Sequence, residues 1–195
     1  RPSERVGIVR STEWKQKVKH EPWLPGETIS AAIGQGYVTV TPLQMASLIG
    51  TVANDGVTNR PRLVQAIMDR TTGQFQQLPV VPKAKLNVKH DTLKLIREAL
   101  AGVVTEGTGG RAKSSIVTIG GKTGTAQTAA LRTGPEKDIP KKFRDHAWFV
   151  AFAPVENPKI AVAVLAEHMG HGGSAAAPLA KEVIETYMKL TAAKP

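Results

Sequence analysis

The pattern of apolar residues first predicts a buried helix over 42–53. Thr41 can cap its first turn, Pro42 stands where a missing N–H costs nothing, and Gln44 can complete a capping box. Gly56 follows soon after the last apolar position and favours a helix end. The apolar residues recur at helical spacing, namely Met45, Ala46, Ile49, Val52 and Ala53. We interpret this stripe as core packing rather than as a cofactor-binding surface.

Three further helices are expected. A short basic one begins at Ser11 or Thr12 and runs through Lys19. A longer one runs from about Asp91 to Glu106, with a stripe formed by Leu93, Ile96, Leu100, Val103 and Val104. Ser174 is the expected cap of a final helix, in which Leu179, Val183, Tyr187 and Leu190 share a face.

Strand patterns occur in three places. Residues 63–68 and 74–78 flank a Gly-containing turn and predict a hairpin. Residues 148–153 and 160–165 predict a second hairpin, beside a strand that leads from an apolar run at Ser115–Ile119 into a Gly-rich stretch. Strands and helices do not alternate regularly along the chain. We therefore expect an α/β protein of the α+β type, with a mostly antiparallel sheet packed with helices.

The chain is expected to divide into a short N-terminal arm and a larger body. Residues 1–28 are expected to form an irregular arm, because prolines and Gly26 interrupt longer elements. Trp14 and Trp23 are expected to anchor this arm to the body of the protein. Residues 29–195 are expected to form the sheet-and-helix body. The charged stretch 128–145 exceeds usual connections between elements and predicts either a functional lid or disorder.

Composition excludes some classes of function. The 195 residues contain no cysteine, which rules out disulfides, thiolate catalysis and Cys-ligated metals. No run of about 18 apolar residues is present to span a membrane. The net charge of +10 attracts polyanions. Because aromatic residues are only 5% and do not alternate with basic ones, we expect no nucleic-acid partner, although polyanion binding stays an alternative.

The Gly-rich stretch Ile119–Gln127 carries the most suggestive chemistry. Its three glycines would let another molecule's backbone lie close, while Lys122, Thr123 and Thr125 offer a positive charge and two hydroxyls. This combination indicates anion recognition. An ordinary Gly-rich edge strand accounts for the same residues.

Other motifs are weaker. Gly107–Ser114 and Ile116–Thr123 each lack one glycine of a phosphate loop, and a strand rather than a helix is expected after Thr123. His168 and His171, with Glu167 and His146, could ligate zinc. Because these histidines lie in a Gly-rich loop and not at i, i+4 on a helix, exposed loop histidines are the favoured interpretation. Asp145 beside His146 could be an acid–base pair or a salt-bridged loop end. No metal or other cofactor is expected.

Taken together, these residues resemble a known family. Lys122-Thr123-Gly124-Thr125 resembles the Lys-Thr-Gly element of penicillin-binding proteins and serine β-lactamases. The run from Gly34 to Ala46 resembles the helix that precedes the sheet in that family. Three further segments resemble the penicillin-binding protein 2 group, the monofunctional, elongation-type peptidoglycan D,D-transpeptidases: residues 13–17, 144–146 and 151–154. The resemblance covers residues 5 to 190.

The resemblance implies a role for each residue of the motif. Lys122 would supply electrostatic potential near the nucleophile, and the Thr123 and Thr125 hydroxyls would bind the substrate's terminal carboxylate. The backbone N–H of Thr125 would be one oxyanion-hole donor, and Gly124 would let the substrate lie along the strand. The implied ligands are peptidoglycan stem peptides and β-lactams.

The resemblance also implies that part of the active site lies outside this sequence. The family uses a Ser-x-x-Lys and a Ser-x-Asn motif, and neither occurs here. We therefore expect the C-terminal portion of a transpeptidase domain, inert as it stands. The serine, an inner-membrane anchor and the other half of the sheet would lie upstream, on the periplasmic side. Other cell-wall elongation proteins are expected partners, and a non-catalytic sensor or binding module is the alternative.

Overall fold

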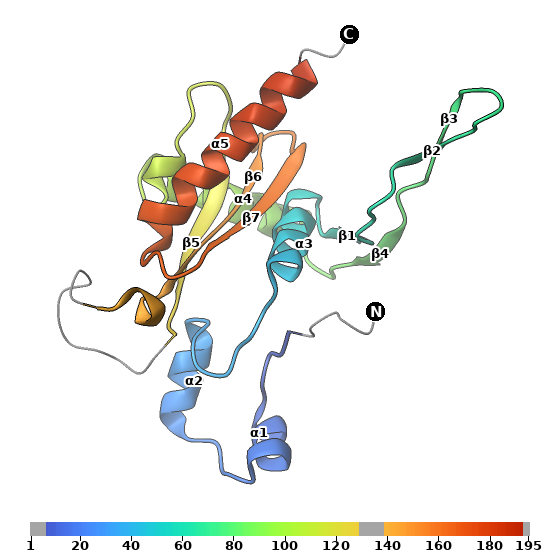
Figure 1. Ribbon diagram of the computed structural model, residues 1–195. Coiled ribbons are helices and arrows are strands. Elements are labelled where there is room, and N and C mark those ends of the chain that lie inside the picture. Colours follow the sequence, from blue (N-terminus) through green and yellow to red (C-terminus); the bar gives the residue numbers. More distant parts are fainter. Residues whose placement is uncertain (1–6, 129–138, 193–195) are drawn as a thin grey trace.

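The computed structural model describes residues 7–128 and 139–192. Helices and strands alternate irregularly along these two ranges (Figure 1). The helices are α1 (Thr12–Lys19), α2 (Pro25–Ala32), α3 (Pro42–Ala53), α4 (His90–Thr105) and α5 (Gly172–Ala192), with short 3₁₀ turns η1 (Gly110–Ala112) and η3 (Lys141–Phe143). The strands are β1 (Val57–Asn59), β2 (Ala66–Met68), β3 (Phe75–Gln77), β4 (Pro82–Lys85), β5 (Gly120–Ala126), β6 (His146–Ala153) and β7 (Ile160–Ala166).

The centre of the fold is the antiparallel sheet β5-β6-β7. Lys122 pairs with Val150, and Val150 pairs in turn with Ala163. This arrangement confirms the predicted hairpin beside the Gly-rich strand. The strand itself begins only at Gly120, whereas residues 115–118 form an irregular approach to it.

Helices cover both faces of this sheet. On one face, Phe149 of β6 is fully buried against α5 together with Ile184. On the other face, Ile49 of α3 packs against Phe152. The cap of α3 is the predicted one, because the Thr41 hydroxyl accepts from the Gln44 N–H and the Gln44 side chain accepts from the Thr41 N–H. The expected α+β architecture is therefore confirmed.

Helix α5 differs from its prediction in its start and in the face that it buries. It begins at Gly172 rather than after Ser174. Its buried face consists mainly of small residues, Ala176, Ala177, Ala180 and Ile184. Small side chains let a helix approach a sheet closely, so this face of α5 is the one that packs against the sheet. The predicted stripe Leu179, Val183, Tyr187 and Leu190 does share a face, and that face is exposed.

The expected irregular arm over 1–28 is wrong for its described C-terminal part. Helix α1 was predicted, but α2 begins at Pro25, where proline fits the first helical position. Glu27 stabilises this start by accepting from the Leu24 N–H at 2.6 Å. The same carboxylate pairs at 2.7 Å with Lys15 of α1, whose side chain is only 3% exposed. The hydrogen bond with Glu27 raises the pKa of Lys15, and the bond from the Leu24 N–H lowers the pKa of Glu27.

The two tryptophans of this segment contact neighbours within it. The Trp14 ring lies 5.7 Å from the Tyr37 ring, and the Arg10 guanidinium stacks 3.9 Å from the Trp14 centroid. Trp23 Nε1 donates to the Thr28 hydroxyl at 2.8 Å. These contacts all lie within residues 10–37, so they do not support the expected anchoring of the arm to the sheet and helices of the body.

Residues 57–85 form an arm that extends away from the sheet (Figure 1). The predicted hairpin is present as the antiparallel pair β2–β3. A second antiparallel pair, β1–β4, was not predicted. Strand β4 begins at Pro82, and proline is tolerated at the first position of a strand. All residues of β3 and β4 are exposed.

The stretch 128–145, predicted as a lid or a disordered segment, is described only in part. Of the predicted lid, residues 129–138 lie outside the described residues. Residues 139–145 contain η3 and lead directly into β6. Within the described ranges, no helix has both the length and the apolar character needed to cross a bilayer.

Candidate active site

Two glycines of strand β5 are required because side chains of the neighbouring strand lie close to them. A Cβ on Gly121 would lie 2.7 Å from the Phe149 ring, and one on Gly120 would lie 2.8 Å from the Phe152 ring. Because both rings are fully buried, neither has room to retreat. The close approach expected at these two glycines is therefore made by the protein's own side chains rather than by another molecule.

The side chains of β5 alternate between the two faces of the sheet. Lys122 is exposed, and its Nζ donates to the Thr123 carbonyl oxygen at 3.0 Å. Its distance to the Thr123 hydroxyl is 3.4 Å. The Lys122 side chain thus bends toward Thr123, and its ammonium lies near the carbonyl oxygen and the hydroxyl of that residue.

Within residues 7–128 and 139–192, no strand pairs with the outer edge of β5. The Thr125 carbonyl accepts from the Gln35 amide at 2.7 Å, and the Thr123 carbonyl accepts from Lys122. Both carbonyls therefore point away from β6. In an antiparallel strand the N–H and C=O of one residue point to the same side, so the Thr125 N–H also faces this free edge.

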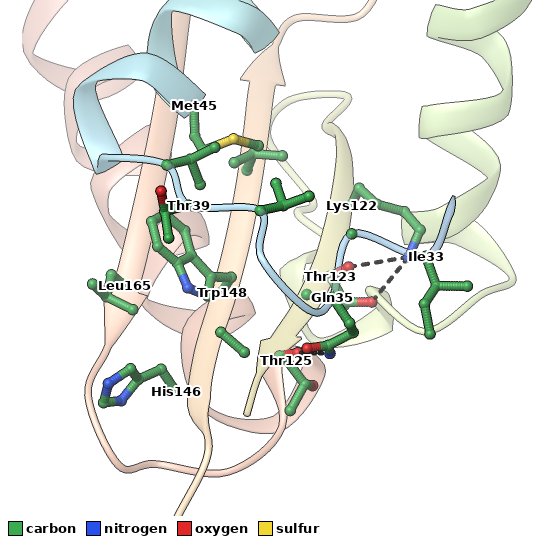
Figure 2. A pocket seen from close by; sticks show the side chains of 16 residues that line it. Ile33, Gln35, Thr39, Met45, Lys122, Thr123, Thr125, His146, Trp148 and Leu165 are labelled. Carbon is green, nitrogen blue, oxygen red and sulfur yellow. Dashed lines mark hydrogen bonds between the residues drawn. The ribbon is translucent and has the colours of Figure 1, made fainter. Parts of the chain in front are cut away.

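A pocket of about 470 Å³ opens beside Lys122 (Figure 2). The loop before α3 covers it through Ile33 and Gln35, while Trp148 of β6 and Leu165 of β7 form its sheet side. Its walls are mostly apolar apart from the Lys-Thr-Gly-Thr segment. An apolar pocket beside a few convergent polar groups is typical of a binding site.

Sequence reasoning did not find the contact of Gln35 with the site. Its flanking glycines, Gly34 and Gly36, both have positive φ angles and form a turn. That turn aims the Gln35 amide at Thr125, which is 90 positions away in the chain. No local signal in the sequence indicates such a contact.

The histidines form a structural contact rather than a three-ligand cluster. The His168 N–H donates to His146 Nδ1 at 2.9 Å, and the two rings meet edge to face at 4.5 Å. His168 Nδ1 lies 3.0 Å from the Arg144 carbonyl, whereas His171 lines a different pocket. Across 7–128 and 139–192, no three or more candidate ligands gather as a metal site would require.

The other weak motifs take ordinary places in the fold. Strand β5 continues through Ala126, so no helix follows Thr123 as a phosphate loop would need. The Asp145 carbonyl accepts from the Gly170 N–H at 3.0 Å and closes the turn after β7.

An antiparallel sheet, helices on both faces and a Lys-Thr-Gly strand at the free edge define the class of penicillin-binding and serine β-lactamase folds. Residues 2–185 match the family described as "Penicillin binding protein transpeptidase domain". The chain therefore belongs to the penicillin-binding protein transpeptidase family.

Relatives and solved structures support this assignment. The "Peptidoglycan D,D-transpeptidase MrdA" of Haemophilus influenzae is 37% identical over 191 residues, which are 95% of this chain and 29% of the relative. Its counterpart in Acinetobacter baumannii is 39% identical over 193 residues, or 96% and 28% of the two chains. This chain thus spans less than a third of the length of these relatives.

Two penicillin-binding protein 2 structures share the fold. The protein from Pseudomonas aeruginosa, solved with WCK 5153, matches with a TM-score of 0.74 and 36% identity, covering 94% of this chain and 38% of that one. The protein from Helicobacter pylori, solved in a complex with MreC, matches with a TM-score of 0.78 and 32% identity, covering 97% and 32%.

Proposed function

We propose that this chain is the C-terminal part of a D,D-transpeptidase domain that cross-links stem peptides of peptidoglycan. The observation that carries the proposal is the free edge of β5. There Lys122, the hydroxyls of Thr123 and Thr125, and the Thr125 N–H come together beside an apolar pocket. The names of the relatives and the family match support the same reaction over a non-catalytic sensor or binding module.

Each group at the edge has a role in acyl transfer. The Thr123 and Thr125 hydroxyls bind the terminal carboxylate of the peptide, and the Lys122 ammonium makes that region positive. The Thr125 N–H donates to the oxyanion that forms when the carbonyl is attacked, and the loss of such a donor typically costs about 3–4 kcal/mol of barrier. The substrate backbone extends along the edge as an added strand, with Gly124 leaving room for it.

The nucleophile of this reaction is a serine that precedes the present sequence. Its Oγ attacks the carbonyl carbon of the penultimate D-Ala, the terminal D-Ala leaves with a proton, and an ester forms. The amine of a second stem peptide then attacks the ester, forms the cross-link and returns the proton to the serine oxygen. The apolar pocket beside Lys122 is the place where we expect the upstream segment with this serine to pack. The reaction needs no cofactor, and β-lactams acylate the same serine.

The setting of the protein is part of the proposal. We place the full-length protein at the inner membrane, with this domain on the periplasmic side and its anchor upstream. The H. pylori neighbour was solved with MreC, and we propose cell-wall elongation proteins of that kind as partners.

Fluorescent penicillin tests the proposal. The longer protein that includes the upstream segment is expected to become covalently labelled. Lys122→Ala should lower the labelling rate at least tenfold, since it removes the charge nearest to Thr123. The 195-residue chain alone should not be labelled.

A control separates a lost charge from a lost fold. Lys113→Ala removes an exposed lysine that does not line the pocket beside Lys122, and it should label like the unchanged protein. If the longer protein is never labelled while its fold is intact, the module is a non-catalytic one. Covalent labelling of the 195-residue chain would show that the nucleophile lies within it.

A further inference from the structure

A second pocket, of about 600 Å³, lies on the opposite side of β5 from the pocket described above. Thr123 and Thr125 form its sheet side, and Thr108 lies next to them. The Thr108 and Thr123 hydroxyls are 2.9 Å apart, which orients the Thr123 side chain into this space. The two threonines that are proposed to hold the substrate carboxylate therefore also line this pocket.

Arg111 is the charged residue of the second pocket. It belongs to η1, whose Ala112 is completely buried and fixes the turn against the body. The guanidinium donates to the Ser174 carbonyl oxygen at 3.2 Å and forms no ion pair with any carboxylate among the described residues. An arginine carries five N–H donors, so several are left for a ligand.

The remaining walls of the pocket carry no negative charge. A Cβ on Gly173 would lie 2.4 Å from the Thr108 carbonyl oxygen, so the start of α5 lies close against the segment that precedes η1. His171 completes the wall. Among the described lining residues there is one cation and no carboxylate, which makes the pocket suitable for an anion.

We propose that Arg111 is a specificity-determining residue for substrates that carry a carboxylate next to the reacting carbonyl. The carboxylate binds between two cations, with Lys122 at the edge of β5 and Arg111 on the side of α5, and the Thr123 and Thr125 hydroxyls lie between them. Arginine suits this place because its planar fork can make two parallel hydrogen bonds to a carboxylate. This inference rests on the proposed function and deepens it, since it names a charge that selects the substrate.

The test compares two acylating agents on the longer protein that includes the upstream segment. One is a penicillin with a free carboxylate, and the other is the methyl ester of the same penicillin. Arg111→Gln should lower the second-order rate constant of acylation by the free acid about tenfold or more, as expected for one lost charge-assisted hydrogen bond. The rate constant for the ester should change less than twofold.

Two matched variants complete the experiment. Lys113→Gln removes the same charge two residues away without lining the pocket, and it should leave the ratio of the two rate constants unchanged. Arg111→Lys keeps the charge but loses the fork, and it should give an intermediate ratio.

The outcomes are separable from those of the proposed function. If Arg111→Gln lowers both rate constants equally, the residue has a merely structural role and the inference is wrong. If Arg111→Gln changes neither rate constant, the inference is also overturned, while the transpeptidase proposal stays intact. If the unchanged protein is acylated by neither compound, the proposed function itself fails.

Discussion

The two faces of the β5-β6-β7 sheet are covered to different degrees. On one face, α5 buries Phe149 completely, and its own Ile184 is equally inaccessible. On the other face, α3 covers Phe152 but leaves Trp148 and Leu165 beside a pocket of about 470 Å³. The first face is closed over Phe149 and is open at the β5 edge, where the second pocket lies, whereas the second face is packed at one end only.

This difference fits the proposal that an upstream segment packs on the second face. A sheet face buries apolar area only when another layer packs on it. The uncovered end of the second face lies next to Lys122, where the proposed upstream segment would bring the serine. Completing the core and assembling the active site would thus be the same event. Four predictions test the contrast between the faces.

The largest effect is expected from Phe149→Ala on the covered face. Removing a fully buried ring leaves a cavity that the tightly packed alanines cannot fill, and should lower the free energy of unfolding by about 3–5 kcal/mol. Urea denaturation of the 195-residue chain measures it. Trp148→Ala, one position along β6 and facing the open end, should cost less than half as much. Equal costs would show that the two faces are equally packed.

Gly172→Ala should be the next most damaging change. Its Cβ would lie 2.1 Å from the Trp148 carbonyl oxygen and 2.5 Å from that of Gly124, and these backbone atoms cannot move aside. We expect a loss of about 1–3 kcal/mol in thermal or urea unfolding.

Gly102→Ala is the matched control for Gly172→Ala. Gly102 lies inside α4, and its added Cβ meets nothing within 4 Å. This variant should be neutral or stabilising by up to about 1 kcal/mol. If both glycine variants behave alike, close contact at Gly172 is not the cause.

On the second face, Thr41→Ala should have a moderate effect. It removes the acceptor of the Gln44 N–H at the start of α3 and should cost about 1 kcal/mol of unfolding free energy. Thr41→Ser keeps the hydroxyl and should retain most of the stability. A serine variant as unstable as the alanine variant would contradict the capping role.

The smallest effect is expected from the ion pair that joins the two helices next to the sheet. Asp55, just after α3, accepts from Arg97 of α4 at 2.5 Å, and this bond lowers the pKa of the Asp55 carboxyl. A lowered pKa stabilises the fold above the ordinary value near pH 4, and this stability is lost as the pH falls through the lowered pKa.

Asp55→Asn should therefore destabilise the chain at pH 6 but not at pH 2. Because the Asp55 side chain is 56% exposed, solvent screening limits the effect to at most about 1 kcal/mol. Urea denaturation at the two pH values measures it. A loss that is as large at pH 2 as at pH 6 would mean that charge is not the cause.

Local signals in the sequence were enough for several elements. The Thr41–Gln44 capping box placed α3 correctly, and the stripe from Leu93 to Val104 predicted α4 to within one residue at each end. The hydrophobic run in β6 predicted a strand in the sheet. These signals are local because a cap or a stripe involves residues within one or two turns of each other.

Other elements depended on distant partners. Helix α2 was missed although Pro25 and Glu27 are local signals of a helix start, and only the pairing of the Glu27 carboxylate with Lys15 is a contact with another helix. The exposed stripe of α5 was the more hydrophobic one, yet small alanines made the closer contact with the sheet. In α5, tertiary packing decided between two faces that the local pattern left open.

The sequence by itself determined the Lys-Thr-Gly-Thr motif, and with it the family and the residue types of the site. Only the tertiary structure decided that β5 is an edge strand, that the Thr125 N–H faces its free side, and that Arg111 lies near Thr123. The physical reason is that residue chemistry is local, whereas an unpaired edge and a shared pocket depend on which distant segments pack together and which place is left uncovered.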